Sequence, residues 1–351
     1  MTFKRIRYVA VFLAVVWLPA CGESFEDAIA RAESGAVTMD RRERQTVIDT
    51  LRKGLEEQEE LSAAAKGRAT AWLGHLLVRH GQYEAAQAVL SDFGATADQL
   101  VAAGDPVSAV RGLGALGAAL VGVRRDFDAV APLDRAATVA AAHDLGTHPV
   151  VIEVRSEMAF LTIVPGVVAH DTRGAAIAAA EELLTQGAEI AQAEGGEDDP
   201  RLGRIDFVRA NLLAYGTEAD TGLDDAARRA VNADILAHLE RARARLGDDH
   251  PTQVPVLEWL AQEAAGRCDT RSVKRLSQEA IAVAEEIYGD TAERTFHART
   301  SHGELLMAMG DMTRGRQIVL DARAARYGKA AGELQAPASP YDPLGCIDPP
   351  G

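Results

Sequence analysis

The sequence has few aromatic residues and no stretch that is typical of a β-strand. Phe, Trp and Tyr make up 5% of its 351 residues, and alternating runs rich in Val, Ile, Thr and aromatic residues are absent. Ala, Leu, Glu and Arg dominate instead, with apolar residues three and four positions apart. The sequence therefore predicts an all-α fold with a core built mainly from Ala and Leu.

Catalytic and metal-binding signatures are missing as well. The chain has no zinc, phosphate-loop, kinase or Gly-x-Ser-x-Gly pattern. The string from Gly112 to Gly117 matches the dinucleotide fingerprint, but that fingerprint needs a preceding strand, and here a helical run begins near Pro106. We attribute its small residues to helix packing and predict no catalytic residues, no cofactor and no metal site.

Basic residues are outnumbered, with 37 Lys and Arg against 52 Asp and Glu and a net charge of -15. An acidic chain of this kind argues against nucleic acid as a partner and against electrostatic attachment to anionic lipid.

Long apolar runs are limited to the N-terminus. Residues 9–18 are apolar without interruption and follow three basic residues, Lys4, Arg5 and Arg7. This run is too short to cross a bilayer as a helix and fits the core of a secretory signal peptide. We expect residues 1–20 to be such a signal, and its removal shifts the net charge from -15 to about -18.

The signal ends in Leu18-Pro19-Ala20-Cys21, which resembles the lipobox of bacterial lipoproteins, although Pro19 is unusual there. The resemblance implies that Cys21 is acylated and anchors the protein to a membrane, because several acyl chains together hold firmly. By analogy with enterobacterial lipoproteins, the presence of Gly22 rather than Asp directly after the lipidated Cys favours the outer membrane. A plain secreted protein and a retained short anchor are the alternatives.

Only three cysteines occur, and lipid on Cys21 would leave Cys268 and Cys346 in a compartment that permits disulfides. A disulfide between them would join the C-terminal tail to the helical segment around residue 268, which belongs to the fifth of the predicted repeats. It would stabilise the fold by about 4 kcal/mol. The alternative is a small turn residue at Cys268 and a free thiol at Cys346.

Turn glycines followed by amphipathic helical patterns recur at spacings of 42, 50, 51 and 42 residues. Self-similarity of this kind marks a repeat architecture, in which no unit buries its apolar face alone. We expect lead-in helices over residues 21–61, six helix pairs over 62–328 and a Pro-rich disordered tail over 329–351. The glycines are Gly104, Gly146, Gly196, Gly247 and Gly289.

Residues 70–90 resemble the tetratricopeptide repeat (TPR), with Gly74 and Ala86 at the positions where its two helices approach closely. The loops at 145–149 and 246–251 share a Gly, His and Pro pattern that resembles the long, 42-residue repeats of kinesin light chains and their bacterial relatives. The resemblance implies a right-handed α-solenoid of stacked TPR-like helix pairs.

The third and fourth repeats each contain about eight extra residues by the repeat comparison. We place the additions in the loops at 165–171 and 217–225, and whether they are functional or neutral stays open.

In a TPR solenoid the first helices line a concave surface that binds extended or helical peptides. The family's inner-face spacing selects ten candidate binding residues here. Trp72 and Trp259 could instead be core residues, and the Lys/Asn clamp for a C-terminal carboxylate is not reproduced. The candidates are Arg68, Trp72, His75, Arg79, Glu258, Trp259, Gln262, His297, Thr300 and Glu304.

These features favour a non-catalytic scaffold or adaptor lipoprotein of the bacterial cell envelope, facing the periplasm, with a protein or peptide partner. A regulatory or sensor arm that binds a peptide or small ligand is the alternative, and an enzyme without a recognisable motif comes third. A peptide partner sensitive to Arg68 and Arg79 would favour the adaptor, whereas stabilisation by a small ligand alone would favour the sensor.

Overall fold

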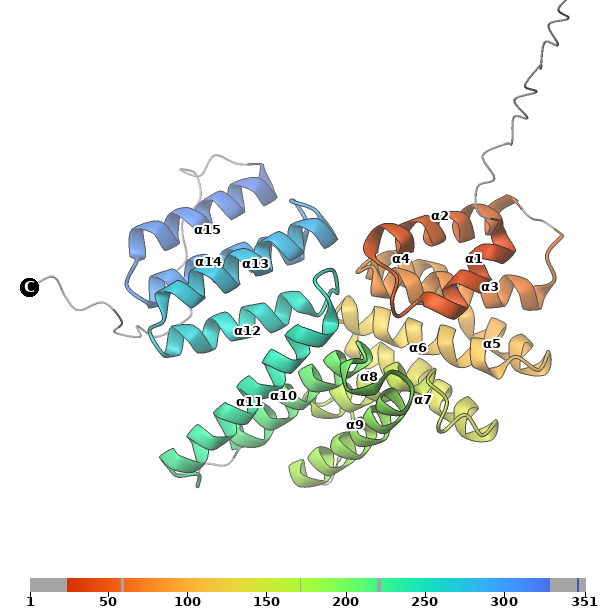
Figure 1. The fold of residues 1–351 in the computed structure, drawn as a ribbon, viewed down its shortest axis with the longest axis horizontal. Coiled ribbons are helices and arrows are strands. Elements are labelled where there is room, and N and C mark those ends of the chain that lie inside the picture. The colour runs from red at the N-terminus through yellow and green to blue at the C-terminus, as the bar shows by residue number, and fades with distance from the viewer. Residues whose placement is uncertain (1–23, 58–59, 171, 220–221, 329–345, 347–351) are drawn as a thin grey trace, which may run out of the picture.

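A computed structural model describes residues 24–57, 60–170, 172–219, 222–328 and 346, and every regular element within them is helical (Figure 1). The prediction of an all-α fold is therefore confirmed for this part of the chain. Besides the short 3₁₀ turn η1 (Gly196–Asp198), its helices are α1 (Phe25–Gly35), α2 (Arg41–Glu57), α3 (Ala63–Arg79), α4 (Tyr83–Leu90), α5 (Phe93–Ala102), α6 (Pro106–Gly122), α7 (Asp126–Ala142), α8 (Val151–Ile163), α9 (Arg173–Gly195), α10 (Arg201–Ala219), α11 (Asp225–Leu246), α12 (Gln253–Gly266), α13 (Thr270–Tyr288), α14 (Glu293–Ala308) and α15 (Met312–Tyr327).

Helices that are neighbours in sequence pack against each other. After the lead-in α1 and α2, the pairs are α3 with α4 and α5, then α6 with α7, α8 with α9, α10 with α11, α12 with α13, and α14 with α15. The first helices of successive pairs also contact each other: α3 contacts α6, and α6 contacts α8. Figure 1 shows the pairs following a curved path from α1–α5 through α6–α11 to α12–α15.

Several helices begin at a polar side chain that caps their first turn. Ser62 accepts a hydrogen bond from the Ala65 N–H, and Asp105 accepts one from Ser108 just before Pro106. Such caps satisfy one of the backbone donors that every helix leaves unpaired at its N-terminus. Thr172, Asp224, Asp269 and Asp311 cap α9, α11, α13 and α15 in the same way.

Small residues let the paired helices approach closely. A Cβ atom added at Gly74 would lie 2.4 Å from a methyl of Leu90, and one at Gly117 would lie 2.4 Å from Leu133. In the dinucleotide-like string, Gly112 lies inside α6, where an added Cβ would come within 2.2 Å of the Phe93 ring. These glycines are therefore explained by packing, because close-packed interiors leave no room for another carbon.

The extra length of the third and fourth helix pairs lies in different places. α9 has 23 residues, α10 has 19 and α11 has 22, against 17 each for α6 and α7. The third pair also has a turn between Ile163 and Arg173. In the fourth pair most of the extra length is helical, so the prediction that placed it in a loop at 217–225 is wrong. In the third pair α8 has only 13 residues, and most of the extra length lies in the turn after Ile163, as the prediction of a loop addition at 165–171 expects.

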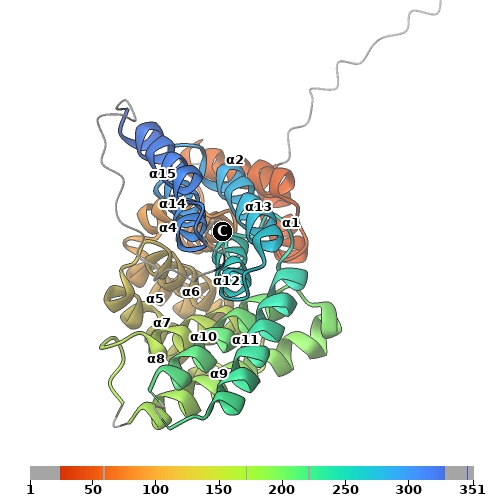
Figure 2. The same cartoon turned by 90° about the vertical axis from the view of Figure 1, so that its left-hand side faces the viewer.

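The two ends of the curved path meet. Arg41 of α2 donates to the Ile287 carbonyl at 3.0 Å, and Arg44 lies 3.4 Å from the Asp249 carboxylate. A further contact joins the Arg294 guanidinium of α14 to the carbonyl at the end of α6. In Figure 2 the α12–α15 end faces the viewer, in front of the α1–α4 region. The helix pairs therefore close on themselves across the middle of the molecule.

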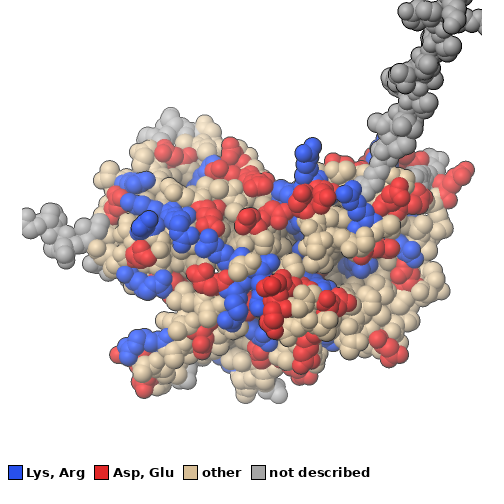
Figure 3. Space-filling model, viewed as in Figure 1, with Lys and Arg blue, Asp and Glu red and all other residues tan. Residues whose placement is uncertain are grey.

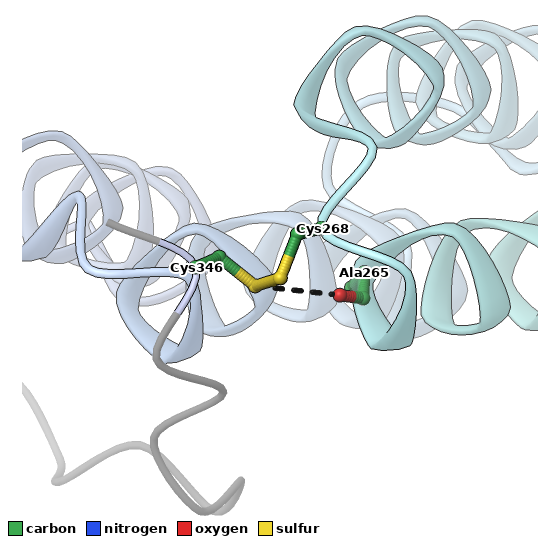
Figure 4. The surroundings of a disulfide bond; sticks show 3 residues. All are labelled: Ala265, Cys268 and Cys346. Carbon is green, nitrogen blue, oxygen red and sulfur yellow. Dashed lines mark hydrogen bonds between the residues drawn. A yellow bond between two sulfur atoms is a disulfide. The ribbon is translucent and has the colours of Figure 1, made fainter. Parts of the chain in front are cut away.

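A disulfide joins Cys268, in the turn after α12, to Cys346, with the two Cα atoms 5.2 Å apart (Figure 4). The Cys346 sulfur lies 3.7 Å from the Ala265 carbonyl oxygen, which is a contact only, because a disulfide sulfur has no proton to donate. The bond fastens residue 346 to the fifth helix pair. Cys21, residues 1–20 and the rest of the tail lie outside the described residues.

Candidate functional site

Where the two ends meet, the helix termini surround a cavity of about 360 Å³, here called the central chamber. Its walls come from the C-terminal ends of α3 and α6, from α8 and α10, from the loop before α12, and from the start of α14. Figure 3 shows acidic and basic side chains gathered near the middle of the face that Figure 1 views. Six lining residues carry the argument: Arg79, Tyr83, Glu153, Glu157, Arg204 and Arg294.

Arg204 and Glu157 form a two-pronged ion pair in the chamber wall. The guanidinium donates to the two carboxylate oxygens at 2.9 and 2.8 Å, and its plane lies between Phe160 and Phe207, 5.4 Å from each ring centre. Burial disfavours the charged guanidinium, but Glu157 outweighs this and raises the Arg204 pKa. The wall is therefore rigid and polar, because both side chains are fixed by their partners.

Glu153, one helical turn before Glu157 on α8, faces two groups from α3. His75 Nδ1 lies 3.1 Å from one carboxylate oxygen, and Arg79 lies 3.6 Å from the other. Burial opposes ionisation of Glu153, but His75 and Arg79 together lower its pKa to about 2. Glu153 is thus a carboxylate at neutral pH and ties the first helix pair to the third.

Arg294 lies at the opposite side of the chamber between aromatic rings. Its guanidinium is 4.9 Å from the Tyr83 ring centre and 5.2 Å from that of Tyr288. Among the described residues it has no carboxylate within ion-pair distance, and the Tyr83 and Tyr288 hydroxyls lie close enough to interact with each other. A guanidinium framed by rings can still accept an anion from solution.

Glu258 of α12 also faces this side. Burial raises the pKa of its carboxyl to about 7, against the opposing effect of Arg294 and Arg124. Because this value is close to neutral pH, Glu258 exchanges between its acid and carboxylate forms under ordinary conditions.

A second cavity of about 360 Å³, the side pocket, adjoins the chamber and shares Glu153 and Arg201 with it. Arg111 of α6 and Trp72 of α3 line it. The Arg111 guanidinium lies 3.6 Å from the centre of the Trp72 ring. Burial lowers the pKa of Arg111 to about 10.

The two Gly, His and Pro loops place a neutral imidazole beside these cavities. His148 Nδ1 accepts the Val150 N–H at 3.1 Å, and His250 Nδ1 accepts the Thr252 N–H at 3.2 Å. Burial is the first cause that lowers both pKa values, and nearby arginines lower them further. The shared loop pattern therefore works as a backbone cap at the start of α8 and α12.

The groove residues predicted from the first repeat come together in part. Trp72, His75 and Arg79 line the two cavities, with Trp72 3% exposed. Trp72 thus belongs both to the core and to a cavity wall. Arg68 points elsewhere and pairs with Asp105 at 2.9 Å, its side chain 47% exposed.

The candidates from the fifth and sixth repeats do not come together at one place. Glu258 lies near the chamber, whereas half-buried Trp259 packs against the core of the α10–α14 region. His297 is exposed beside Glu293, and the Thr300 hydroxyl bonds to the Phe296 carbonyl. Gln262 is exposed and Glu304 is half-buried, with a pKa raised by burial.

Sequence reasoning missed Glu153, Glu157, Arg204, Arg294 and Arg111. A signal was present for the first two, because Glu153 and Glu157 are four residues apart in the otherwise largely apolar α8. Two carboxylates on one buried helix face need partners, so the pattern could have pointed to a polar interior.

A third hollow of about 660 Å³ lies among α9, α10 and α11 and is mainly apolar. Within the described residues no group of three or more His, Cys, Asp or Glu side chains is arranged to hold a metal ion, and no helix there has the length and apolarity to span a bilayer. The chain matches no known protein-family model and has no significant match among curated proteins.

Proposed function

We propose that this protein is a non-catalytic binding protein, built as an α-solenoid of TPR-like helix pairs, that takes a small polar ligand or a short peptide end into its central chamber. One observation carries the proposal. Charged and aromatic side chains from well-separated helices converge on one cavity where the first and last helix pairs meet.

The size of the chamber favours a small ligand over a folded partner. A cavity of about 360 Å³ falls in the range of small-molecule pockets. A helix about 10 Å across needs a longer and wider groove. The geometry therefore supports the regulatory or sensor arm better than an adaptor that holds a helix along its inner surface.

A ligand here would act on the closure between the two ends. Arg79 and Tyr83 come from the first helix pair, while His250 and Arg294 come from the fifth and sixth. A ligand that touches both sets binds the closed form more tightly than an open one and so shifts the population toward closure. The distance between the first and last helix pairs would then depend on whether the chamber holds a ligand.

The adaptor remains a second candidate, and exposed apolar side chains favour it. Phe127 is 68% exposed, and Met312 and Tyr327 of the last helix are 46% and 59% exposed. A partner protein that covers them would remove apolar surface from water. Attachment to the cell envelope through Cys21, facing the periplasm, is part of either proposal.

Thermal unfolding of the full-length protein against a panel of small polar compounds and short peptides tests the proposed function. Val121 lines the chamber and Val130 does not, although both are partly buried against the same core. We expect one or more compounds to raise Tm in the wild type and in Val130→Phe but not in Val121→Phe.

Two other outcomes would contradict the proposal. Equal stabilisation of both valine variants would place the ligand outside the chamber. If no compound stabilises the protein, and crosslinking in cells recovers one protein near stoichiometrically, the adaptor would replace the sensor.

A further inference from the structure

The side pocket contains Arg111, a half-buried cation that makes no ion pair and no side-chain hydrogen bond with a described residue. Its guanidinium lies against the face of Trp72, and the carboxylates of Glu153, Glu33 and Asp105 act on it only from a longer distance. A guanidinium has five N–H donors, and no nitrogen of Arg111 is among the fully buried unpaired atoms, so these donors can be reached from the pocket. An anion bound at this place would give the guanidinium a direct partner.

A second unpaired donor lines the same pocket. Trp72 is 3% exposed, and its indole N–H has no hydrogen-bond partner among the described residues. Buried indole N–H groups are usually hydrogen-bonded. Arg111 and Trp72 thus offer a planar fork and a single donor from two adjacent helices, a set that suits a carboxylate.

The other charges of the side pocket select among anions. Glu33, Glu153 and Glu194 also line it. Glu153 is held by His75 and Arg79, and Glu194 lies 3.1 Å from Arg201, whereas exposed Glu33 makes no ion pair with a described residue and acts on Arg111 only from a longer distance. Three carboxylates repel a dianion such as phosphate, but they attract a positive group attached to a monoanion.

We propose that the side pocket binds a small zwitterion of the amino-acid type, with its carboxylate on Arg111 and Trp72 and its ammonium group toward Glu33 and Glu194. The site goes beyond the proposed function, because its ligand contacts lie outside the central chamber. Free amino acids and dipeptides share this chemistry, and a volume of about 360 Å³ admits either one.

Isothermal titration of the full-length protein tests the inference. The probes are glycine, L-lysine, L-glutamate and glycylglycine, with acetate, ethanolamine and inorganic phosphate as partial ligands. We expect at least one zwitterion to bind at least tenfold more tightly than acetate, ethanolamine or phosphate, because only a zwitterion meets both sets of charges. Tighter binding of glycylglycine than of the amino acids would identify a dipeptide, and the reverse order a free amino acid.

Four variants locate the site. Arg111→Met keeps the side-chain bulk on Trp72 and should weaken zwitterion binding at least tenfold. Glu33→Gln, on an exposed position, should weaken the zwitterion and strengthen acetate. Arg68→Met removes an exposed arginine of α3 outside the side pocket, and Val121→Phe fills the central chamber, so both should leave the zwitterion affinity within twofold.

The inference is overturned if Arg111→Met binds the zwitterion as the wild type does, or if phosphate binds more tightly than every zwitterion. Loss of zwitterion binding in Val121→Phe but not in Arg111→Met would move the ligand to the central chamber, which contradicts this inference and supports the proposed function. If no zwitterion binds while other compounds stabilise the wild type and not Val121→Phe, this inference fails and the proposed function stands.

Discussion

Replacing Arg204 with Met should destabilise the protein by about 3–5 kcal/mol, because it leaves the Glu157 carboxylate buried without its partner. Glu157 is 8% exposed, and the lost interaction comprises two charge-assisted hydrogen bonds of 2.8 and 2.9 Å. Glu157→Gln should cost a similar amount by stranding the guanidinium. The double variant Arg204→Met with Glu157→Leu should lose much less than the sum, because no buried charge remains.

A surface pair provides the matched control. Arg243 and Glu279 are joined by two contacts of 2.7 and 2.8 Å, but their side chains are 28% and 34% exposed, against 19% and 10% for Arg204 and Glu157. Arg243→Met should cost below about 1 kcal/mol, since water screens an exposed pair.

The assay is urea unfolding followed by far-UV circular dichroism and by tryptophan fluorescence, whose coincidence checks two-state behaviour. Losses below about 1 kcal/mol for both single variants, with an additive double variant, would refute the reasoning. The chamber wall would then be solvated, and the pair would be no different from one on the surface.

Three further predictions concern single positions. Glu258→Gln should raise stability relative to the wild type by about 3 kcal/mol at pH 8 and by almost nothing at pH 4, because a folded pKa of about 7 makes the wild type lose stability as pH rises from 4.5 through 7; a difference independent of pH would contradict this. Cys268→Ser and Cys346→Ser should each lower stability by about 4 kcal/mol, since the bond closes a loop with a sequence separation of 78 residues; the double variant should match either single one in urea unfolding, and full additivity would be the contrary result. Gly74→Ala should cost about 1–3 kcal/mol by crowding Leu90, whereas Gly174→Ala, whose added Cβ would meet only the Thr172 hydroxyl at an ordinary contact distance of 3.9 Å, should cost nothing; equal unfolding midpoints for the two variants would argue against tight packing at Gly74.

The local structure could be predicted because it depends on short-range patterns. Apolar residues at helical spacing define the helices, and the twelve-residue gap between Gly74 and Ala86 reflects contact within one pair. The first-repeat residues His75 and Arg79 were placed on the cavity side because helical spacing alone decides which face they share.

The closure could not be predicted, because it depends on small rotations that add up over six helix pairs. The contact of Arg294 with the end of α6 spans 172 residues in sequence, and nothing local in either segment indicates it. For the same reason Glu157 could not be matched with Arg204, which lies 47 residues further on in another pair. Helix length was misjudged in the fourth repeat, where α10 and α11 take up most of the extra residues, because an insertion with good helix formers extends a helix as readily as it forms a loop.

Hydrogen–deuterium exchange of the wild type, with and without the most stabilising compound of the panel, tests the central claim most directly. Binding in the chamber predicts added protection at the end of α3, in α8, at the start of α10, in the loop before α12 and at the start of α14, which are the segments that wall the cavity. Protection confined to the apolar hollow among α9, α10 and α11, with the chamber segments unchanged, would contradict the account.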